Sequence, residues 1–496
     1  MTTRASLAEL LRDPGSSAPA IVSTSPLVVV SYKALAEQVE RLSGQLRGAG
    51  LKPADCVAII IPNSLEFLVI FLALTHARLV AAPLNPAGKP DEIRFFIEDA
   101  QARAVVAEAG NVAVREAAVG LGFPIWHPRG DSRDVVQLSG LPSTSCAGID
   151  APKPDDVALF AYTSGTTGRS KCVPLTHANV IWSSRNIAAH YALTAADRSL
   201  VVLPLFHGHG LIGATLSTLA SGGSVIMPPR FSAFEFWKLF REHRATWYSA
   251  VPTIHQVLLE RADTDGAPNR GPRFIRSCSA PLASTILRKL ENRFGAPVLE
   301  AYGMTEASHQ VASNPLPPLP RKPGTVGPGA GMSIIDKTGR HLGANASGEV
   351  VVRGPNVMRG YRNNPEANAA AFVDGWFRTG DIGAMDDDGY LGLTGRIKDL
   401  INRGGEKISP AEVEAVLLEH SAVAQAAVFG VPDPKYGEEV SAAVVLRGAA
   451  TAEQLQAHCR TRLADFKVPK LIHMVSAIPK NAMGKVDRRN LTALFS

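Results

Sequence analysis

The decapeptide Tyr162-Thr-Ser-Gly-Thr-Thr-Gly-Arg-Ser-Lys171 follows a short apolar segment, residues 157–161, that is typical of a buried strand. It combines hydroxyl side chains, two glycines that let a ligand approach the backbone closely, and a cation at its end. This combination predicts a loop that binds a polyphosphate. A flexible linker is the alternative interpretation, but strand-like sequence on both sides disfavours it. The loop is not a Walker A motif, because that motif would place glycine at Ser170, directly before Lys171.

Strand-like and helical segments alternate along the chain on both sides of this loop. A helix is expected over 64–77, and strands are expected over 57–61, 79–83, 104–107, 199–203, 224–227, 247–251 and 273–276. This alternation predicts an α/β fold in which parallel-rich sheets are covered by helices. Residues 314–331 are rich in Pro and Gly and are expected to be a loop. Antiparallel strands over 348–353 and 389–393 then predict a β-barrel-like subdomain.

The last part of the chain has a pattern of its own. Helices are expected over 410–419 and 451–463, and strands are expected over 423–430 and 440–446. This order predicts a small α+β domain at residues 398–496, with residues 1–397 forming the larger N-terminal domain.

Composition excludes several classes of protein. Of the 496 residues, 46% are hydrophobic and 19% are charged, which are ordinary values for a globular chain and exclude wholesale disorder. The net charge of +6 fits a phosphate-rich partner, but no long basic stretch with interleaved aromatic residues indicates a nucleic acid. The five cysteines are scattered without a zinc-binding pattern, which favours a reducing compartment. No apolar run is long enough to span a membrane, so we expect a cytoplasmic protein, either a monomer or a homodimer.

Three further motifs carry side chains that suit a nucleotide. Ala301-Tyr-Gly-Met-Thr-Glu306 offers a ring that can stack on a base and a carboxylate that can hold Mg²⁺ against phosphates. Thr379-Gly-Asp381 offers a carboxylate for the hydroxyls of a ribose, and Gly484-Lys485 offers a cation on a glycine loop. Each motif is weak alone, because charged residues in loops are usually solvated. Their order along one chain is the informative feature.

A competing signal is Gly208-His-Gly-Leu-Ile-Gly213, which fits the pattern of a dinucleotide-binding turn. In that fold the next strand, expected here over 224–227, would end in an acidic residue that holds the ribose. It ends in Pro228-Pro229-Arg230 instead, which disfavours a nicotinamide oxidoreductase.

Taken in order, these motifs resemble those of the adenylate-forming superfamily, which includes acyl-CoA synthetases, firefly luciferases and peptide-synthetase adenylation domains. Gly395-Arg-Ile-Lys398 and Arg403-Gly-Gly-Glu-Lys407 add to the resemblance, which covers essentially the whole chain. More narrowly, the chain is similar to oxalate–CoA ligases of plants and fungi. The stretches that carry this similarity are 204–211, 246–256, 273–280, 304–309 and 313–316.

The resemblance implies a two-step reaction. ATP and a carboxylic acid give an acyl-AMP and pyrophosphate, and the acyl group then passes to the thiol of coenzyme A. Mg²⁺ is the implied metal, held by Glu306. Lys485, Thr305, Glu306 and His207 are the implied catalytic residues. The implied nucleotide-binding residues are Thr163, Ser164, Gly165, Thr166, Thr167, Gly168, Lys171, Ser279, Ala280, Pro281, Ala301, Tyr302, Gly303, Met304, Asp381 and Arg396.

The resemblance also implies a mobile C-terminal lid. The lid turns about a hinge at Lys398, withdraws Lys485 after adenylation, and brings the turn formed by Arg403, Gly404 and Gly405 to coenzyme A. The family's phosphate loop usually has proline and glycine where this chain has Ser170 and Cys172. This departure predicts weakened adenylation as the alternative outcome.

The identity of the acid is left open at this stage. An acyl pocket is expected around His207, Trp247, Ser279, His309 and Asn314, where imidazoles suit the second carboxylate of oxalate or another small dicarboxylate. Buried, structurally satisfied histidines are the alternative interpretation. The other candidate substrate is a larger biosynthetic carboxylic acid, loaded mainly through the thioester-forming half-reaction.

Overall fold

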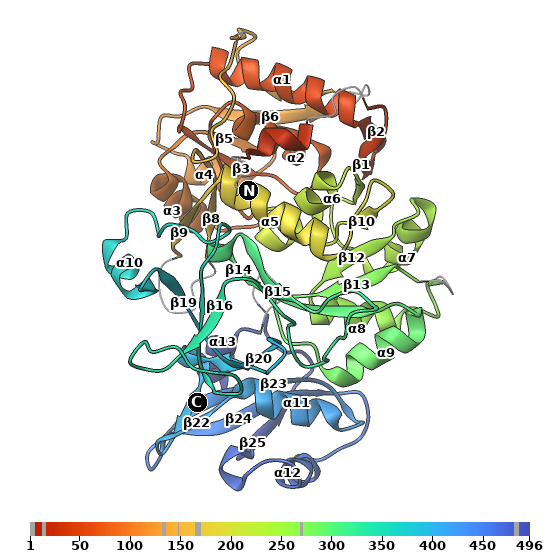
Figure 1. Cartoon of the computed structure of the whole chain (residues 1–496), viewed down its shortest axis with the longest axis vertical. Helices are drawn as coiled ribbons and strands as arrows, with labels where there is room; N and C mark the ends of the chain where they lie inside the picture. Colours follow the sequence, from red (N-terminus) through yellow and green to blue (C-terminus); the bar gives the residue numbers. More distant parts are fainter. Residues whose placement is uncertain are drawn as a thin grey trace.

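The computed structural model describes residues 5–11, 16–130, 135–146, 148–163, 170–267, 271–480 and 486–496. Two large sheets lie in the N-terminal part, with a smaller sheet and a separate C-terminal sheet below them in the view of Figure 1. The predicted α/β class is confirmed.

The first large sheet has seven strands in the order β7-β6-β5-β3-β4-β8-β9. Its central strands are parallel, and β7 and β9 pair antiparallel at its edges. The strands are β3 (Cys56–Ile60), β4 (Val80–Pro83), β5 (Ala102–Ala107), β6 (Ile125–Gly130), β7 (Val136–Ser139), β8 (Val157–Tyr162) and β9 (Cys172–Thr176). The helices associated with it are α1 (Tyr32–Gly48), α2 (Leu65–His76), α3 (Pro90–Ala100) and α4 (Val112–Ala117).

The second large sheet has eight strands in the order β15-β14-β13-β12-β10-β11-β1-β2 and is parallel except at its two edges. Its strands are β1 (Pro19–Thr24), β2 (Leu27–Ser31), β10 (Arg198–Leu200), β11 (Ser224–Met227), β12 (Trp247–Ala250), β13 (Phe274–Ser277), β14 (Val298–Met304) and β15 (His309–Ser313). Its helices are α5 (His177–His190), α6 (Ser217–Ala220), α7 (Ala233–Glu242), α8 (Pro252–Glu260) and α9 (Ser284–Phe294). Short helical turns are η1 (Leu7–Leu11) and η3 (Thr305–Ala307), and η2 (His209–Leu216) is a π-helix.

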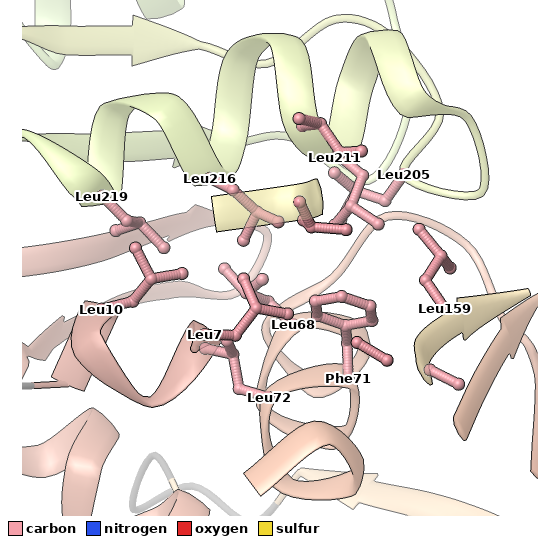
Figure 2. Packing of buried hydrophobic residues seen from close by; sticks show 14 of the residues in the cluster. Leu7, Leu10, Leu68, Phe71, Leu72, Leu159, Leu205, Leu211, Leu216 and Leu219 are labelled. Carbon is pink, nitrogen blue, oxygen red and sulfur yellow. The ribbon is translucent and has the colours of Figure 1, made fainter. Parts of the chain in front are cut away.

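The two large sheets share one hydrophobic core. Helix α2 begins at the N-cap Ser64, whose hydroxyl accepts from the backbone N of Phe67. Because α2 is apolar on nearly every face, it is buried all round. Figure 2 shows Leu68 and Phe71 of α2 facing Leu211 and Leu216 of η2. This packing fixes the position of the loop and the π-helix that begin the candidate site.

The third sheet is antiparallel and corresponds to the predicted β-barrel-like subdomain. It runs β16-β17-β19-β18, with β20 pairing with β19. Its elements are β16 (Met332–Ile335), β17 (Gly348–Val352), α10 (Pro365–Ala371), β18 (Phe372–Val373), β19 (Trp376–Met385) and β20 (Leu391–Arg396).

The chain leaves this sheet after Arg396, and the turn η4 (Ile397–Asp399) leads into the C-terminal sheet. Its strands are β21 (Ile401–Arg403), β22 (Glu406–Ile408), β23 (Val423–Asp433), β24 (Gly437–Leu446) and β25 (Leu471–Met474). Its helices are α11 (Pro410–Glu419), α12 (Ala452–Arg460) and α13 (Arg488–Phe495), with the short turn η5 (Asp465–Lys467). Throughout the described ranges, no helix combines the length and apolar character needed to cross a membrane.

Candidate active site

A cavity of about 340 Å³ lies where the carboxyl ends of strands from the two large sheets meet. The segments that line it follow β3 and β4 of one sheet and β10, β11, β12 and β13 of the other. The carboxyl ends of parallel strands are where α/β proteins bind their ligands. The lining residues are Pro62, Asn63, Pro86, Val202, Leu203, Pro204, Phe206, His207, His209, Pro229, Arg230, Phe231, Val251, Ile254 and Ser279.

Asn63 connects the two sheets at this cavity. Its side-chain amide donates to the carbonyl of Leu203 at 2.9 Å and accepts from the backbone N of Leu205 at 2.8 Å. Asn63 follows β3 of one sheet, whereas Leu203 and Leu205 follow β10 of the other. A single buried amide therefore fixes the loop that carries His207 and His209.

The polar end of the cavity contains His207, His209 and Ser279. Nδ1 of His209 lies 2.9 Å from Oγ of Ser279, and its Nε2 lies 2.6 Å from Oγ of the buried Ser249. The ring of His209 also stacks on that of His309, with the ring centroids 4.9 Å apart. Most of the remaining lining is apolar and includes Val202, Leu203, Phe206, Phe231, Val251 and Ile254.

Arg276, on β13, lies behind this polar end and is fully buried. Its guanidinium contacts the hydroxyl of Tyr191 at 2.8 Å, Oγ of Ser249 at 3.0 Å, Nε2 of His309 at 3.0 Å and Oε1 of Gln310 at 2.9 Å. None of these four acceptors is a carboxylate. Where the structure describes its surroundings, Arg276 therefore has no carboxylate partner. A buried cation without one is costly to maintain, and such groups are concentrated at functional sites.

Two residues of the site have strained backbones. Ser279 has φ +73° and His309 has φ +85°, in the left-handed region that favours glycine. Strain of this kind costs of order 1–3 kcal/mol and persists where the surrounding structure imposes it. At Ser279 it positions a side chain that lines the cavity.

Tyr302, Asp381 and Arg396 form the second polar group of the site. The hydroxyl of Tyr302 donates to Oδ2 of Asp381, and Nε of Arg396 donates to Oδ1 of the same carboxylate at 2.8 Å. Burial and the neighbouring Asp381 raise the pKa of Tyr302 well above its ordinary value, so it stays a hydrogen-bond donor. The structure brings these three predicted nucleotide-binding residues together.

Gly303 is required where β14 passes β15. A Cβ at this position would lie 1.5 Å from the carbonyl oxygen of His309. The ladder shifts register between Tyr302 and Gly303, so the strand bends at the motif. Ala301 and Met304 belong to the same strand, and Thr305 begins the turn η3.

Glu306, in η3, is the predicted magnesium ligand. Its Oε1 accepts from the hydroxyl of Tyr361 at 2.8 Å, and Lys171 Nζ lies 4.7 Å from the centroid of the Tyr361 ring. The described residues contain no cluster of three or more His, Cys, Asp and Glu side chains placed to hold a metal. A single partly exposed carboxylate fits Mg²⁺, because that ion usually takes one or two carboxylates together with phosphate oxygens and water.

The phosphate loop is described only at its base. The backbone N of Thr163 donates to the carbonyl of Lys171 at 3.1 Å, and the backbone N of Lys171 donates to Oγ1 of Thr163 at 3.2 Å. Several predicted site residues lie outside the described residues, namely Ser164, Gly165, Thr166, Thr167, Gly168 and Lys485.

Some predicted pocket residues lie elsewhere. Trp247 is buried in the core, where its ring stacks on Phe274 at 5.0 Å between centroids. The Asn314 side chain donates to the carbonyl of Thr325 and holds a loop rather than lining the cavity. His309 is not among the residues that line the cavity, and its ring stacks on that of His209. Ala280 and Pro281, predicted to bind nucleotide, are exposed after β13.

Cys172 occupies the place of the family's glycine, and its side chain is buried. It lies in β9, and its side chain is buried with Cys56, Val80 and Phe160. Burial raises the pKa of its thiol to about 12. The substitution therefore fills a small core, and Ser170 is the departure that lies within the loop itself.

The predicted hinge residue lies between the third sheet and the C-terminal sheet, and the turn predicted to bind coenzyme A belongs to the C-terminal sheet. Lys398 sits in η4, and burial, followed by the charge of Arg396, lowers its pKa. Gly404 and Gly405 have φ of +60° and +97°, which allow the tight hairpin between β21 and β22. The Arg403 guanidinium lies 4.2 Å from the ring centroid of Tyr436, so the turn packs on its own domain.

Sequence reasoning missed Arg276, His209 and Ser249 as site residues. His209 lies within the GxGxxG pattern noted in the sequence, but the glycines at 210 and 213 are needed for close packing rather than for binding a phosphate. A Cβ at Gly210 would lie 2.3 Å from the carbonyl oxygen of Pro204, and one at Gly213 would lie 2.5 Å from Nε2 of His309. The segment is a π-helix, a conformation common at functional sites, and the dinucleotide interpretation is wrong.

Comparison with known proteins identifies the family. The model of the AMP-binding enzyme family matches residues 12–362, and that of its C-terminal domain matches residues 412–485. An oxalate–CoA ligase of Arabidopsis thaliana is 48% identical over 96% of this chain and 95% of its own length. An oxalate–CoA ligase of Saccharomyces cerevisiae is 42% identical over 89% and 87%. The crystal structure of ATP-bound MatB from Rhodopseudomonas palustris matches with a TM-score of 0.89 and 33% identity, over 99% of both chains.

The chain belongs to the AMP-binding enzyme family. The predicted membership of the adenylate-forming superfamily and the class of AMP-forming acid–thiol ligase are confirmed.

Proposed function

We propose that this enzyme joins oxalate, or a dicarboxylate of similar size, to coenzyme A at the expense of ATP. The observation that carries the proposal is the polar end of the cavity, where His209 and Ser279 are hydrogen-bonded to each other beside His207. Hydrogen-bond donors at this end suit the second carboxylate of a short diacid. The relatives named as oxalate–CoA ligases support the same choice.

In the first half-reaction, one carboxylate oxygen of the acid forms a bond to the α-phosphorus of ATP. The bond from that phosphorus to the bridging oxygen breaks, and pyrophosphate leaves. Because negative charge accumulates on phosphoryl oxygens, catalysis rests on positioned donors and cations. Thr305 and Lys485 contact the reacting groups in this proposal, and Mg²⁺ at Glu306 would supply charge neutralisation on the phosphates.

The nucleoside is held by the group around Asp381. Its carboxylate already accepts from Tyr302 and from Arg396 at 2.8 Å, so it is oriented before a ribose arrives. Pre-orientation lowers the entropic cost of binding. The Thr163–Lys171 loop covers the departing pyrophosphate in this proposal.

In the second half-reaction, the coenzyme A thiolate attacks the acyl carbon and AMP leaves. Residues 398–496 rotate about Lys398, which removes Lys485 and brings Arg403, Gly404 and Gly405 to the thiol. The position of Lys398 in η4, between the last strand of one sheet and the first of the next, supports this hinge.

A larger biosynthetic acid is the second candidate substrate. The apolar wall that includes Phe206, Phe231 and Ile254 favours it, because a bulky acyl chain would cover this surface. The polar end of the cavity, by contrast, would leave donors unpaired against such a chain.

Acid-dependent exchange of radiolabelled pyrophosphate into ATP distinguishes these candidates. The panel contains oxalate, malonate, acetate, a fatty acid and an aryl acid. We expect exchange with oxalate to exceed exchange with acetate and with the bulky acids. Exchange only with bulky acids would overturn the proposal, and absence of exchange combined with thioester formation from supplied acyl-AMP would support the weakened-adenylation alternative.

A further inference from the structure

We propose that Arg276 is a positioning residue that sets the direction of a hydrogen-bond chain ending at Ser279. The chain runs from Arg276 through Ser249 and His209, and it turns the Ser279 hydroxyl into a donor toward the cavity. This inference rests on the proposed function, because the Ser279 hydroxyl would be the group that recognises the second carboxylate of the acid.

The chain starts at a group that can only donate. A guanidinium has five N–H donors and no acceptor. Arg276 donates through Nη1 to Oγ of Ser249 at 3.0 Å. Ser249 is buried, and among the described residues its hydroxyl has only one other partner, Nε2 of His209 at 2.6 Å. Because Ser249 accepts from Arg276, it donates its own proton to His209.

This direction fixes the tautomer of His209. With Nε2 accepting from Ser249, the neutral imidazole carries its proton on Nδ1. Nδ1 lies 2.9 Å from Oγ of Ser279, so His209 donates to Ser279. The Ser279 hydroxyl then has no acceptor among the described residues, and Ser279 lines the cavity. Its proton is available to a ligand.

Arg276 also fixes the protonation of a second histidine, His309. Nη2 of Arg276 lies 3.0 Å from Nε2 of His309, so His309 is also neutral with its proton on Nδ1. His309 stacks on His209. The described partners of the guanidinium are therefore neutral, and the branch through Ser249 and His209 is the one that reaches the cavity.

The positive charge of Arg276 also favours a substrate that carries a second negative charge. Its side-chain acceptors Tyr191, Ser249, His309 and Gln310 are neutral, and it also contacts the thiol of Cys278, so within the described residues no carboxylate touches its positive charge. A carboxylate bound at Ser279 would lie at the end of a chain polarised by this buried cation. In a low-dielectric interior such a chain favours a dicarboxylate over a monocarboxylate of similar size.

The test breaks the chain at Ser249, a small residue whose replacement by alanine leaves the core volume almost unchanged. In Ser249→Ala we expect the KM for oxalate to rise by about tenfold, with the KM for ATP changed by less than about twofold. Ser249→Thr keeps the hydroxyl and restores the KM for oxalate. The matched control is Ser277→Ala, which removes a buried hydroxyl of the same strand as Arg276 that has no partner in the described structure.

A second readout is the tautomer of His209, measured by NMR of ¹⁵N-histidine-labelled enzyme and assigned with His209→Gln. We expect an Nδ1–H tautomer in the wild type and a mixture of tautomers in Ser249→Ala. An Nε2–H tautomer in the wild type, or an unchanged KM for oxalate in Ser249→Ala, would overturn the relay. Failure of the wild type to use oxalate while the Nδ1–H tautomer persists would overturn the proposed substrate and leave the chain's direction supported.

Discussion

Arg396 donates through Nε to Oδ1 of Asp381 over 2.8 Å, directly across the β19–β20 ladder in which these two residues are register partners. The ion pair forms at the last residue of β20, immediately before the chain enters η4 and the C-terminal domain. The side chain of Asp381 is 6% exposed, whereas that of Arg396 is 44% exposed. The carboxylate proposed to hold ribose is thus attached to the element at which the lid is proposed to turn.

Asp381→Asn is expected to weaken nucleotide binding. The variant loses the charge that accepts from Tyr302 and Arg396, and hydrogen bonds to charged groups contribute about 1.5–3 kcal/mol. The KM for ATP is expected to rise at least tenfold, with a smaller change in the KM for the acid. Asp336→Asn, in an exposed turn, is the matched control and is expected to leave both constants unchanged. Equal effects of the two variants would contradict the assignment.

Lys485→Ala is expected to separate the two half-reactions. The lysine acts only in adenylation in the proposed mechanism, so pyrophosphate exchange is expected to fall by about 100-fold or more. Thioester formation from supplied acyl-AMP and coenzyme A is expected to stay near the wild-type rate. A parallel loss of both activities would contradict a role confined to the first step.

Cys172→Gly, which restores the family's residue, is expected to destabilise the protein. The buried thiol packs with Cys56, Val80 and Phe160, and removing it leaves a cavity in a strand that also gains backbone freedom. We expect a loss of about 1–2 kcal/mol in the free energy of unfolding, measured by urea titration. Adenylation is expected not to improve. A faster pyrophosphate exchange at unchanged stability would show that the departure from the family pattern restrains the loop.

Stability is expected to fall as the pH drops below about 6.5, the ordinary pKa of histidine. Burial lowers the pKa of His177 to about 4, and its Nδ1 accepts from the backbone N of Leu7 at 3.2 Å. Between pH 6.5 and 4 the unfolded chain binds the proton and the folded chain does not, so stability falls with pH in this window. Urea titrations at pH 7 and pH 5 measure the loss. His177→Asn keeps an acceptor without the titration and is expected to show a smaller loss. An identical pH slope in both proteins would contradict this role for His177.

Local sequence patterns predicted the helices and strands that consist of a clearly bounded apolar run. Helix α2 and strand β11 lie close to their expected ranges. Each is a run of apolar residues with a clear boundary, Ser64 before the helix and Pro228 after the strand. Strand β10 is shorter than expected. The expected strand extended to Leu203, but Asn63 draws this segment out of the sheet and into the cavity wall.

Long-range pairings were not predictable from one sequence. Strand β1 pairs in parallel with β11, although about two hundred residues separate them, and no local pattern encodes that register. The role of Arg276 was not predictable either, because the sequence around it indicates only a strand. Only the fold shows that its guanidinium reaches Ser249 and His309. The motifs predicted nucleotide-binding roles for Tyr302 and Asp381, and the family resemblance added Arg396. The structure brings the three side chains together, and their role stays a prediction.

The most direct measurement is the mass of the thioester that the purified enzyme forms from ATP, Mg²⁺, coenzyme A and an equimolar mixture of oxalate, acetate and an aryl acid. We expect oxalyl-CoA as the main product, with AMP and pyrophosphate formed in equal amounts. A product mixture dominated by the aryl thioester, with no oxalyl-CoA, would contradict this expectation.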